Sequence, residues 1–326
     1  MQEKILISID TGKHSIKALL KYQGQIFTIM FRSKLQKVER FGIDLEPNSY
    51  HVKFGVNEYL IGDMVSEDYS DFTLSKTSLL HQLSIYTCIA VLLEKAKIPL
   101  PLQSKIHLAI NAPINVYKDT NLKEAHRDLI ENSHQTILIS VNNRLFSFRL
   151  DNVIICFEGM GSIYDQMDQF KNKTSIIVDI GGLNTTLCSF KGIQPLFNTM
   201  TVSNQGINVL KGKVGKVINE RFGLSVSADD LEQILQRGYL AHKGQIIEES
   251  KQFIEEIKRE HLLQIIQFAQ SREYTFNTDS IHFCGGGAYL LEKFIKEEFP
   301  FSNVMVNPQF ANAKSFLKIL EIKANG

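Results

Sequence analysis

Apolar residues at the start of the chain recur at the spacing of a β-rich meander. Runs of apolar and β-branched residues predict strands over residues 4–9, 16–22 and 25–31, with a tight Gln-Gly turn between the last two. A hairpin is predicted around Gly55, a helix over residues 77–96 and a strand over residues 105–111. More β-hairpins are expected from there up to Ile155. The first half of the chain is therefore predicted to be mostly sheet, with one long helix.

The same pattern restarts at Ser175. Strands are predicted over residues 175–180 and 185–190, with a further apolar run up to Val202. Helices are then predicted over residues 206–221, 228–237, about 245–270 and 289–298, with a strand over 279–284. No low-complexity linker separates the halves, so they are expected to pack across a cleft.

Both halves end their first strand in a carboxylate followed by glycine. The first reads ILISIDTG and ends in Asp10, and the second reads SIIVDIGGLNTTLC and contains Asp179. A carboxylate at the end of a buried strand is costly unless a cation or a hydrogen-bond donor meets it. Neighbouring glycines let backbone amides approach an anion closely. The pair suits a hydrated Mg²⁺ with phosphates; ordinary hairpin turns also use Asp and Gly, but the repetition favours the phosphate site.

Two further features could serve the same ligand. Lys17 could place its ammonium on phosphates, or it could be a surface lysine. Gly285, Gly286 and Gly287 in HFCGGGAYLL follow an apolar strand and open a helix. They would allow close approach of a flat ring or a sugar, or they could form a plain loop. The usual phosphate-loop and dinucleotide-binding motifs are absent from the sequence.

Composition narrows the class of protein. The chain has 326 residues, 44% hydrophobic and 22% charged, which predicts about two globular domains. The net charge is only +1, and the basic residues do not cluster in the sequence. This argues against direct DNA binding and against a polybasic face that binds membranes. No apolar run is long enough to span a membrane, and no secretory signal is indicated. The isolated residues Cys88, Cys156, Cys188 and Cys284 are expected to be buried, reduced thiols of a cytosolic protein.

The motifs resemble those of a known superfamily. IDTGKHSIK, VDIGGLNTT and FCGGGAYLL resemble the two phosphate loops and the adenosine loop of the actin, sugar-kinase and heat-shock-chaperone ATPases, in the same order. CFEGMGSIYD, QGINVLKGKV and NPQFANAKSFLKI resemble segments of bacterial ParM-type plasmid segregation proteins, although Ser315 stands where that family usually has Gly.

The resemblance implies an α/β fold of the actin-like (ribonuclease H-like, duplicated) kind, with two domains and a central nucleotide cleft. The first domain is expected over residues 1–165 and the second over 166–326, with a last helix at about 309–322 that packs back on the first domain.

The resemblance also implies roles for individual residues. Asp10 and Asp179 would bind Mg²⁺, mostly through water. Glu158 matches the acid that positions the attacking water, whereas its alternative is a surface acid between the halves. The residues implied to contact ATP (or GTP) are Thr11, Gly12, Lys17, Gly181, Gly182, Thr185, Thr186, Gly285, Gly286 and Gly287.

These features favour a cytoplasmic, filament-forming, Mg²⁺-dependent ATP or GTP hydrolase that drives plasmid DNA segregation. By the resemblance, it would self-associate into filaments and reach DNA through an adaptor protein bound to a centromere-like site, without contacting DNA or a membrane itself. A small-molecule (sugar-type) kinase on the same fold is the main alternative, and a nucleotide-binding module with little turnover is a third. The sequence leaves open the nucleotide preference, the adaptor, and the strand number and handedness of a filament.

Overall fold

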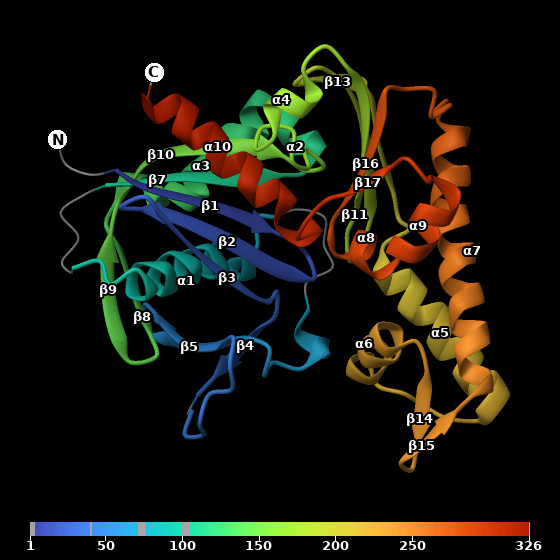
Figure 1. The fold of residues 1–326 in the computed structure, drawn as a ribbon. Helices are drawn as coiled ribbons and strands as arrows, with labels where there is room; N and C mark the ends of the chain where they lie inside the picture. Colours follow the sequence, from blue (N-terminus) through green and yellow to red (C-terminus); the bar gives the residue numbers. More distant parts are fainter. Residues whose placement is uncertain (1–3, 40, 71–75, 100–104, 326) are drawn as a thin grey trace. The chain divides into compact units, whose positions relative to one another are not determined.

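The computed structural model describes residues 4–39, 41–70, 76–99 and 105–325 (Figure 1). The chain divides into two compact units. Unit 1 comprises Met1–Glu158 and Asn312–Gly326, and unit 2 comprises Gly159–Ala311.

The main sheet of unit 1 has five strands in the order β10-β7-β1-β2-β3. Strand β1 pairs in parallel with β7, which pairs in parallel with β10, whereas β2 and β3 continue the sheet as an antiparallel meander. The three parallel strands therefore end at the same edge. The strands are β1 (Ile5–Thr11), β2 (Ser15–Tyr22), β3 (Gln25–Arg32), β7 (Ile106–Ala112) and β10 (Leu150–Phe157).

Helices cover both faces of this sheet (Figure 1). Helix α1 (Leu79–Lys95) packs on β1, β2 and β3 and shares their apolar core. Helix α10 (Ala311–Asn325) lies on the other face, where Ser8 Oγ donates to the Ala313 carbonyl over 2.8 Å and Lys21 pairs with Glu321 at 2.6 Å. The last helix of the sequence therefore packs in the first unit.

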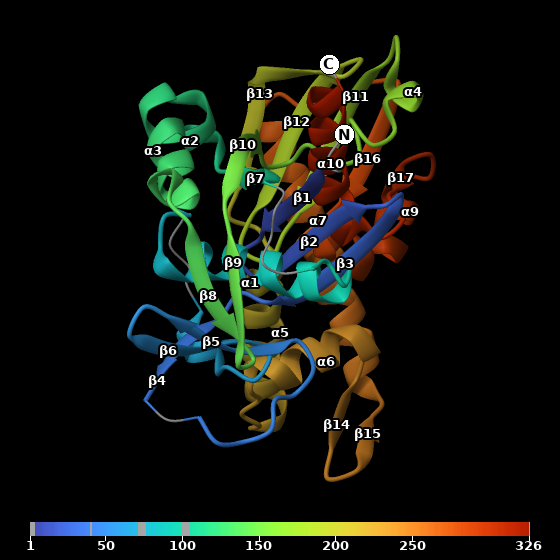
Figure 2. The ribbon, with the colours of Figure 1, turned by 90° about the vertical axis from the view of Figure 1, so that its left-hand side faces the viewer.

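A second sheet of unit 1 has the order β4-β6-β5-β8-β9 (Figure 2). The inward-facing side chains of this sheet belong to the same apolar core as α1. The last hairpin of the sheet turns through Asn142 and Asn143, which both have a positive φ, a conformation that Asn tolerates. Its strands are β4 (Leu35–Val38), β5 (Ser49–Phe54), β6 (Asn57–Gly62), β8 (Ile137–Val141) and β9 (Arg144–Phe148), and the short helix η1 (Glu67–Tyr69) follows β6.

The prediction of β-hairpins between residue 113 and Ile155 is confirmed for the hairpin of β8 and β9 but is wrong for residues 114–134. The helices α2 (Ile114–Lys118) and α3 (Thr120–Glu131) and the turn η2 (Asn132–His134) precede β8, and α3 packs on β10 (Figure 2). Asp119 caps α3 by accepting a hydrogen bond from the Leu122 amide over 3.0 Å. The helix buries only His126, Ile130 and Glu131, so the sequence offers few apolar residues from which to predict it.

The sheet of unit 2 repeats this meander in the order β13-β12-β11-β16-β17. Strand β11 pairs antiparallel with β12 and parallel with β16, as β1 does with β2 and β7. The strands are β11 (Thr174–Ile180), β12 (Thr185–Lys191), β13 (Gln194–Ser203), β16 (Ser280–Cys284) and β17 (Asn303–Val304).

The helical part of unit 2 follows the prediction with two corrections. The predicted helix at about 245–270 begins only at Glu249, because residues 245–247 form a hairpin strand that turns through Lys243 and Gly244. The helix predicted over 289–298 is two short helices that meet at Leu291. The elements are α4 (Met167–Phe170), α5 (Ile207–Phe222), α6 (Ala228–Arg237), β14 (Leu240–His242), β15 (Gln245–Ile247), α7 (Glu249–Ser271), α8 (Gly286–Leu290), α9 (Glu292–Glu298) and η3 (Pro308–Phe310).

The four cysteines are buried, as expected. Among the helices described, none has the length and apolar character needed to cross a membrane.

Candidate functional site

Three polar side chains stand at the carboxyl ends of the adjacent parallel strands of unit 1. Asp10 is the second-last residue of β1 and is only 7% exposed, Asn111 is the second-last residue of β7, and Glu158 directly follows β10. The Asn111 side-chain amide donates to Asp10 Oδ1 over 2.7 Å and, more weakly, to Glu158 Oε1 over 3.5 Å. The buried Asn111 therefore links the two predicted carboxylates.

The orientation of Asn111 is fixed by its neighbour on β1. Asn111 Oδ1 accepts hydrogen bonds from the Thr11 amide over 2.8 Å and from the Thr11 hydroxyl over 2.7 Å. Sequence reasoning assigned Thr11 to the ligand and missed Asn111. A signal for Asn111 existed, because it is the polar residue that follows the apolar run 108–110 at the end of a predicted strand.

A buried lysine pairs with the predicted catalytic acid. Lys76 Nζ lies 2.5 Å from Glu158 Oε1, and the lysine side chain is 3% exposed. His126 on α3 is also buried, and its pKa falls to about 4 because of that burial, with a further contribution from the Lys76 ammonium. His126 is therefore neutral near pH 7, and the charge beside Lys76 is that of Glu158.

The first predicted phosphate turn joins β1 to β2. Lys17 stands directly opposite Asp10 in the register of the two strands. A Cβ added to Gly12 would lie 2.6 Å from the Ser15 carbonyl oxygen and 2.9 Å from Lys17 Nζ. The turn therefore needs glycine at this position, and the Lys17 ammonium lies against it.

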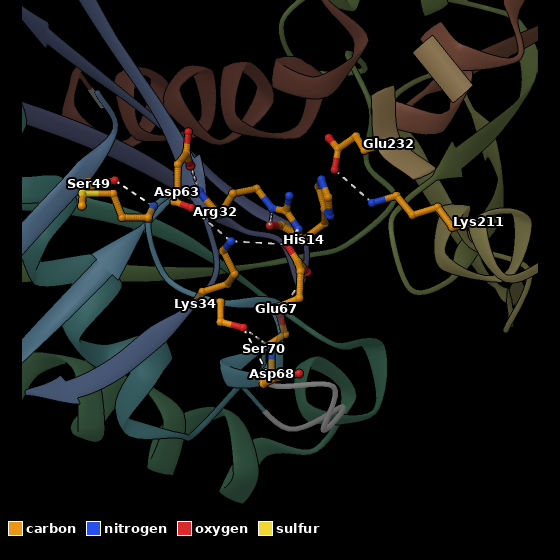
Figure 3. A network of polar contacts seen from close by, with 12 residues as sticks. His14, Arg32, Lys34, Ser49, Asp63, Glu67, Asp68, Ser70, Lys211 and Glu232 are labelled. Carbon is orange, nitrogen blue, oxygen red and sulfur yellow. Dashed lines mark hydrogen bonds and ion pairs between the residues drawn. The ribbon is translucent and has the colours of Figure 1, made fainter. Parts of the chain in front are cut away.

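A network of hydrogen bonds and ion pairs between charged side chains contacts this turn (Figure 3). Arg32 Nε donates to the His14 carbonyl over 3.2 Å, and Arg32 Nη2 pairs with Glu67 at 2.6 Å. Lys34 Nζ lies 3.3 Å from the same Glu67 carboxylate. The turn is thereby tied to the segment that follows β6.

The second predicted turn, in unit 2, is packed against the start of α5. The Gly181 amide donates to the Asn184 carbonyl over 2.9 Å. The first amides of α5 donate to the turn, from Ile207 to Gly181 O over 3.0 Å and from Asn208 to Gly182 O over 2.8 Å. A Cβ on Gly206 would collide with this turn, since the Leu183 carbonyl carbon would lie at 2.3 Å. The amino terminus of a long helix therefore supports the turn directly.

The two threonines after this turn are buried. The Thr185 hydroxyl donates to the Gln205 carbonyl over 2.7 Å, which ties β12 to the residue before Gly206. Thr186 stands opposite Asp179 in the register of β11 and β12. Its methyl group packs against Gly159, where an added Cβ would lie 2.7 Å away.

The three glycines after β16 are not equivalent. Gly285 has a φ of +82°, and an added Cβ would lie 2.3 Å from the Ile180 carbonyl oxygen and 2.5 Å from Asp179 Oδ1. A Cβ on Gly287 would lie 2.3 Å from Ile180 Cγ2, whereas one on Gly286 would meet nothing within 4 Å. Gly285 and Gly287 are thus required by packing, and Gly286 borders open space.

Each unit brings together the predicted site residues of its own half. In the described part of the chain, no three His, Cys, Asp or Glu side chains gather closely enough to hold a metal ion by themselves. Unit 1 contains Asp10, Thr11, Gly12, Lys17 and Glu158, and unit 2 contains Asp179, Gly181, Gly182, Thr185, Thr186, Gly285, Gly286 and Gly287.

Comparisons with known proteins agree with the predicted fold. The family model for the N-terminal domain of actin-like proteins matches residues 8–161. A 15-stranded ParM filament from Clostridium botulinum matches with a TM-score of 0.78 at 22% identity, over 98% of this chain and 100% of that one. The Alp12 filament structure matches with a TM-score of 0.70 at 26% identity, over 98% and 99%. The archaeal actin homologue Ta0583 in complex with ADP matches with a TM-score of 0.76 at 13% identity, over 99% and 100%.

No curated protein matches the sequence. The expected fold class, an α/β actin-like fold with a sheet in each of two halves, is confirmed.

Proposed function

We propose that the chain is an actin-like, filament-forming ATPase that drives plasmid DNA segregation. Support comes from the actin-like family model that matches residues 8–161 and from the actin-like fold along nearly the whole chain. The main support for the proposal is that Asn111 donates hydrogen bonds to both Asp10 and Glu158, where three parallel strands end side by side. Open α/β sheets bind their ligands at this edge. Filaments are formed by the ParM of Clostridium botulinum and by Alp12, and Ta0583 binds ADP.

The residues fit Mg²⁺ and a nucleotide. Mg²⁺ is usually bound through one or two carboxylates and keeps several waters, and Asp10 and Asp179 are such carboxylates in their respective units. Asp10 is nearly buried and oriented by Asn111, which suits a group that must meet a cation. The open space at Gly286 leaves room for a ligand beside the backbone. When bound, Mg²⁺ neutralises charge on the phosphates.

The proposed chemistry is carried by four side chains of unit 1. Asn111 holds Asp10, the Lys17 ammonium at the first turn binds phosphate oxygens, and Glu158 orients the attacking water and accepts its proton. Such general-base assistance is worth about 10²–10⁴ in rate. In unit 2, Asp179, Gly181, Gly182, Thr185 and Thr186 would serve the phosphates, and Gly286 would border the adenosine.

Hydrolysis would control assembly in this proposal. A bound nucleotide shifts a conformational equilibrium only by its different affinity for the two states, so loss of the γ-phosphate contacts would favour disassembly. The partners would be further copies of the chain and an adaptor protein on a centromere-like plasmid site, in the cytoplasm. With a net charge of +1, direct binding to DNA phosphates would be weak.

One assembly experiment tests the proposal. Light scattering and pelleting are measured with ATP, GTP, ADP or no nucleotide, each with Mg²⁺ or with EDTA. We expect assembly with a nucleoside triphosphate and Mg²⁺, followed by phosphate release and disassembly. Absence of assembly under every condition, together with ADP release that requires an added sugar, would instead support the kinase alternative.

A further inference from the structure

The ion pair between Lys76 and Glu158 is unusual because the lysine is almost completely buried. The Lys76 side chain is 3% exposed, whereas that of Glu158 is 23% exposed. Removing an ammonium from water is costly, and an apolar side chain of similar size usually fills such a place at lower cost. Packing alone therefore does not account for a lysine at this position.

The contacts of Glu158 are concentrated on one of its two oxygens. Among the described residues, Lys76 Nζ at 2.5 Å and Asn111 Nδ2 at 3.5 Å both approach Oε1. Asn111 is itself fixed by Asp10 and Thr11. The carboxylate is thus held by two donors on one side, which leaves Oε2 for a further donor such as water.

We propose that Lys76 is a positioning residue for hydrolysis: its ammonium fixes Glu158 through Oε1, so that Oε2 is aimed at the attacking water. The inference rests on the proposed function, in which Glu158 orients that water. Lys76 itself touches neither the nucleotide nor the water in this scheme. Misplacing a catalytic group by about 1 Å can cost about 10²-fold in rate, so a residue that only orients Glu158 can have a large kinetic effect.

The buried surroundings of Lys76 support this assignment. The neighbouring His126 is uncharged near neutral pH and therefore does not balance the lysine charge. His126 is hydrogen-bonded to the backbone of Asn111, so the histidine, the lysine, the asparagine and Glu158 pack as one group. The position of the ammonium is therefore determined by the core of unit 1.

The test uses the full chain and five variants. Lys76→Met removes the charge at similar volume, Lys76→Arg keeps the charge, and Glu158→Gln removes the carboxylate but keeps an acceptor for Lys76. The double variant combines Lys76→Met with Glu158→Gln. Lys258→Met is the control, because Lys258 on α7 is also a buried lysine and its ammonium donates to the Leu235 carbonyl over 2.6 Å, away from the residues assigned to the nucleotide. For each, single-turnover hydrolysis of Mg²⁺-ATP, the Kd for the nucleotide and thermal unfolding are measured.

We expect Lys76→Met to slow hydrolysis by about 10- to 100-fold while the Kd stays within about threefold of wild type. Lys76→Arg should restore most of the rate. In the Glu158→Gln background, Lys76→Met should change the rate by less than about twofold, since its effect passes through the carboxylate. Lys258→Met should hydrolyse like wild type even if it unfolds at a lower temperature.

The outcomes separate this inference from the proposed function. If Glu158→Gln is slow but Lys76→Met hydrolyses like wild type, the role of Lys76 is overturned and that of Glu158 stands. If Glu158→Gln hydrolyses at the wild-type rate, both roles are overturned. Equal slowing by Lys76→Met in both backgrounds would show a structural role only. Should Lys76→Met fail to fold, Lys76→Gln, which keeps a donor to Glu158 without the charge, takes its place with the same expected loss of rate.

Discussion

The side-chain amide of Asn111 donates a hydrogen bond to Asp10 Oδ1 over 2.7 Å, and the two residues end adjacent parallel strands of unit 1. The same asparagine accepts two hydrogen bonds from Thr11. A carboxylate that is proposed to face Mg²⁺ therefore depends for its orientation on a residue one strand away.

This relationship predicts the effect of Asn111→Ala. Asp10 would lose its donor, and the buried Thr11 amide would lose its acceptor, which costs about 1–3 kcal/mol of stability. We expect the affinity for Mg²⁺-ATP to fall about 10-fold or more. Calorimetric titration and thermal unfolding measure the two effects. Asn142→Gly is a suitable control, because it removes the acceptor of the His51 amide elsewhere in the unit and should leave nucleotide affinity unchanged.

The two strand-end carboxylates give the second prediction. Asp10→Ala and Asp179→Ala should each abolish the Mg²⁺-dependent part of nucleotide binding and turnover while the fold is kept. Titrations with Mg²⁺ and with EDTA, beside circular dichroism spectra, check both statements. ATPase activity equal to wild type in either variant would contradict the phosphate site.

The inequivalent glycines after β16 give a matched pair of variants. Gly286→Val should fold normally, because an added Cβ meets nothing within 4 Å, yet it should weaken nucleotide binding by filling the space beside the backbone. Gly287→Val should instead lower the unfolding temperature, because its Cβ would lie 2.3 Å from Ile180 Cγ2. Titration of Gly286→Val with unchanged affinity would leave this loop with a structural role alone.

The sequence predicted the sheets better than the helices between them. Strands β1 and β11 were predictable because they are apolar runs that end in Asp and glycine, a pattern that needs no tertiary information. Helix α3 was not, because it buries only His126, Ile130 and Glu131, and two of these are polar residues that a search for apolar positions passes over. The hairpin strand β15 was predicted as part of α7, because its apolar residues continue the helical spacing of the residues that follow.

The site could be predicted only where its residues lie in a motif. Asp10, Gly12 and Lys17 stand on one turn, so their proximity follows from local sequence. The pairing of Lys76 with Glu158 joins residues far apart in the chain, and nothing around Lys76 marks it as different from a surface lysine. Only the packing of unit 1 reveals that it is buried.

A buried histidine of unit 2 predicts how stability depends on pH. The pKa of His261 falls to about 4, mainly because of burial and also because the Lys213 ammonium lies 3.3 Å from Nδ1. The unfolded chain, with a histidine pKa of about 6.5, binds a proton that the folded chain rejects, so stability is full above about pH 6.5 and is lost as the pH falls toward 4. Between pH 7 and 5 this loss is about 2 kcal/mol for one such histidine.

The variant His261→Leu should reduce that loss. Nε2 of His261 has no hydrogen-bond partner among the described residues, so an apolar side chain is tolerated there. Urea unfolding at pH 7 and pH 5 gives the difference, with His242→Gln on the exposed hairpin as control. An equal loss of unfolding free energy in wild type and His261→Leu would show that the histidine is already protonated in the fold.

The last prediction separates hydrolysis from assembly, and the structure decides which substitution to use. Glu158→Ala would leave the buried Lys76 without its partner, at a cost of about 3–5 kcal/mol, whereas Glu158→Gln keeps an oxygen that accepts from the ammonium. Because Glu158 is assigned to the attacking water and not to phosphate binding, Glu158→Gln should bind nucleotide and polymerise like wild type.

Phosphate release from Glu158→Gln should then fall by about 10²-fold or more, and its filaments should persist longer, since the γ-phosphate contacts are kept. Light scattering and phosphate release are followed in the same sample, so that each filament population is compared with its own hydrolysis. Filaments that disassemble as fast as wild type while phosphate release is slow would break the proposed link between hydrolysis and disassembly. Phosphate release within a few-fold of wild type would remove Glu158 from the reaction, and with it the reason for a buried lysine at position 76.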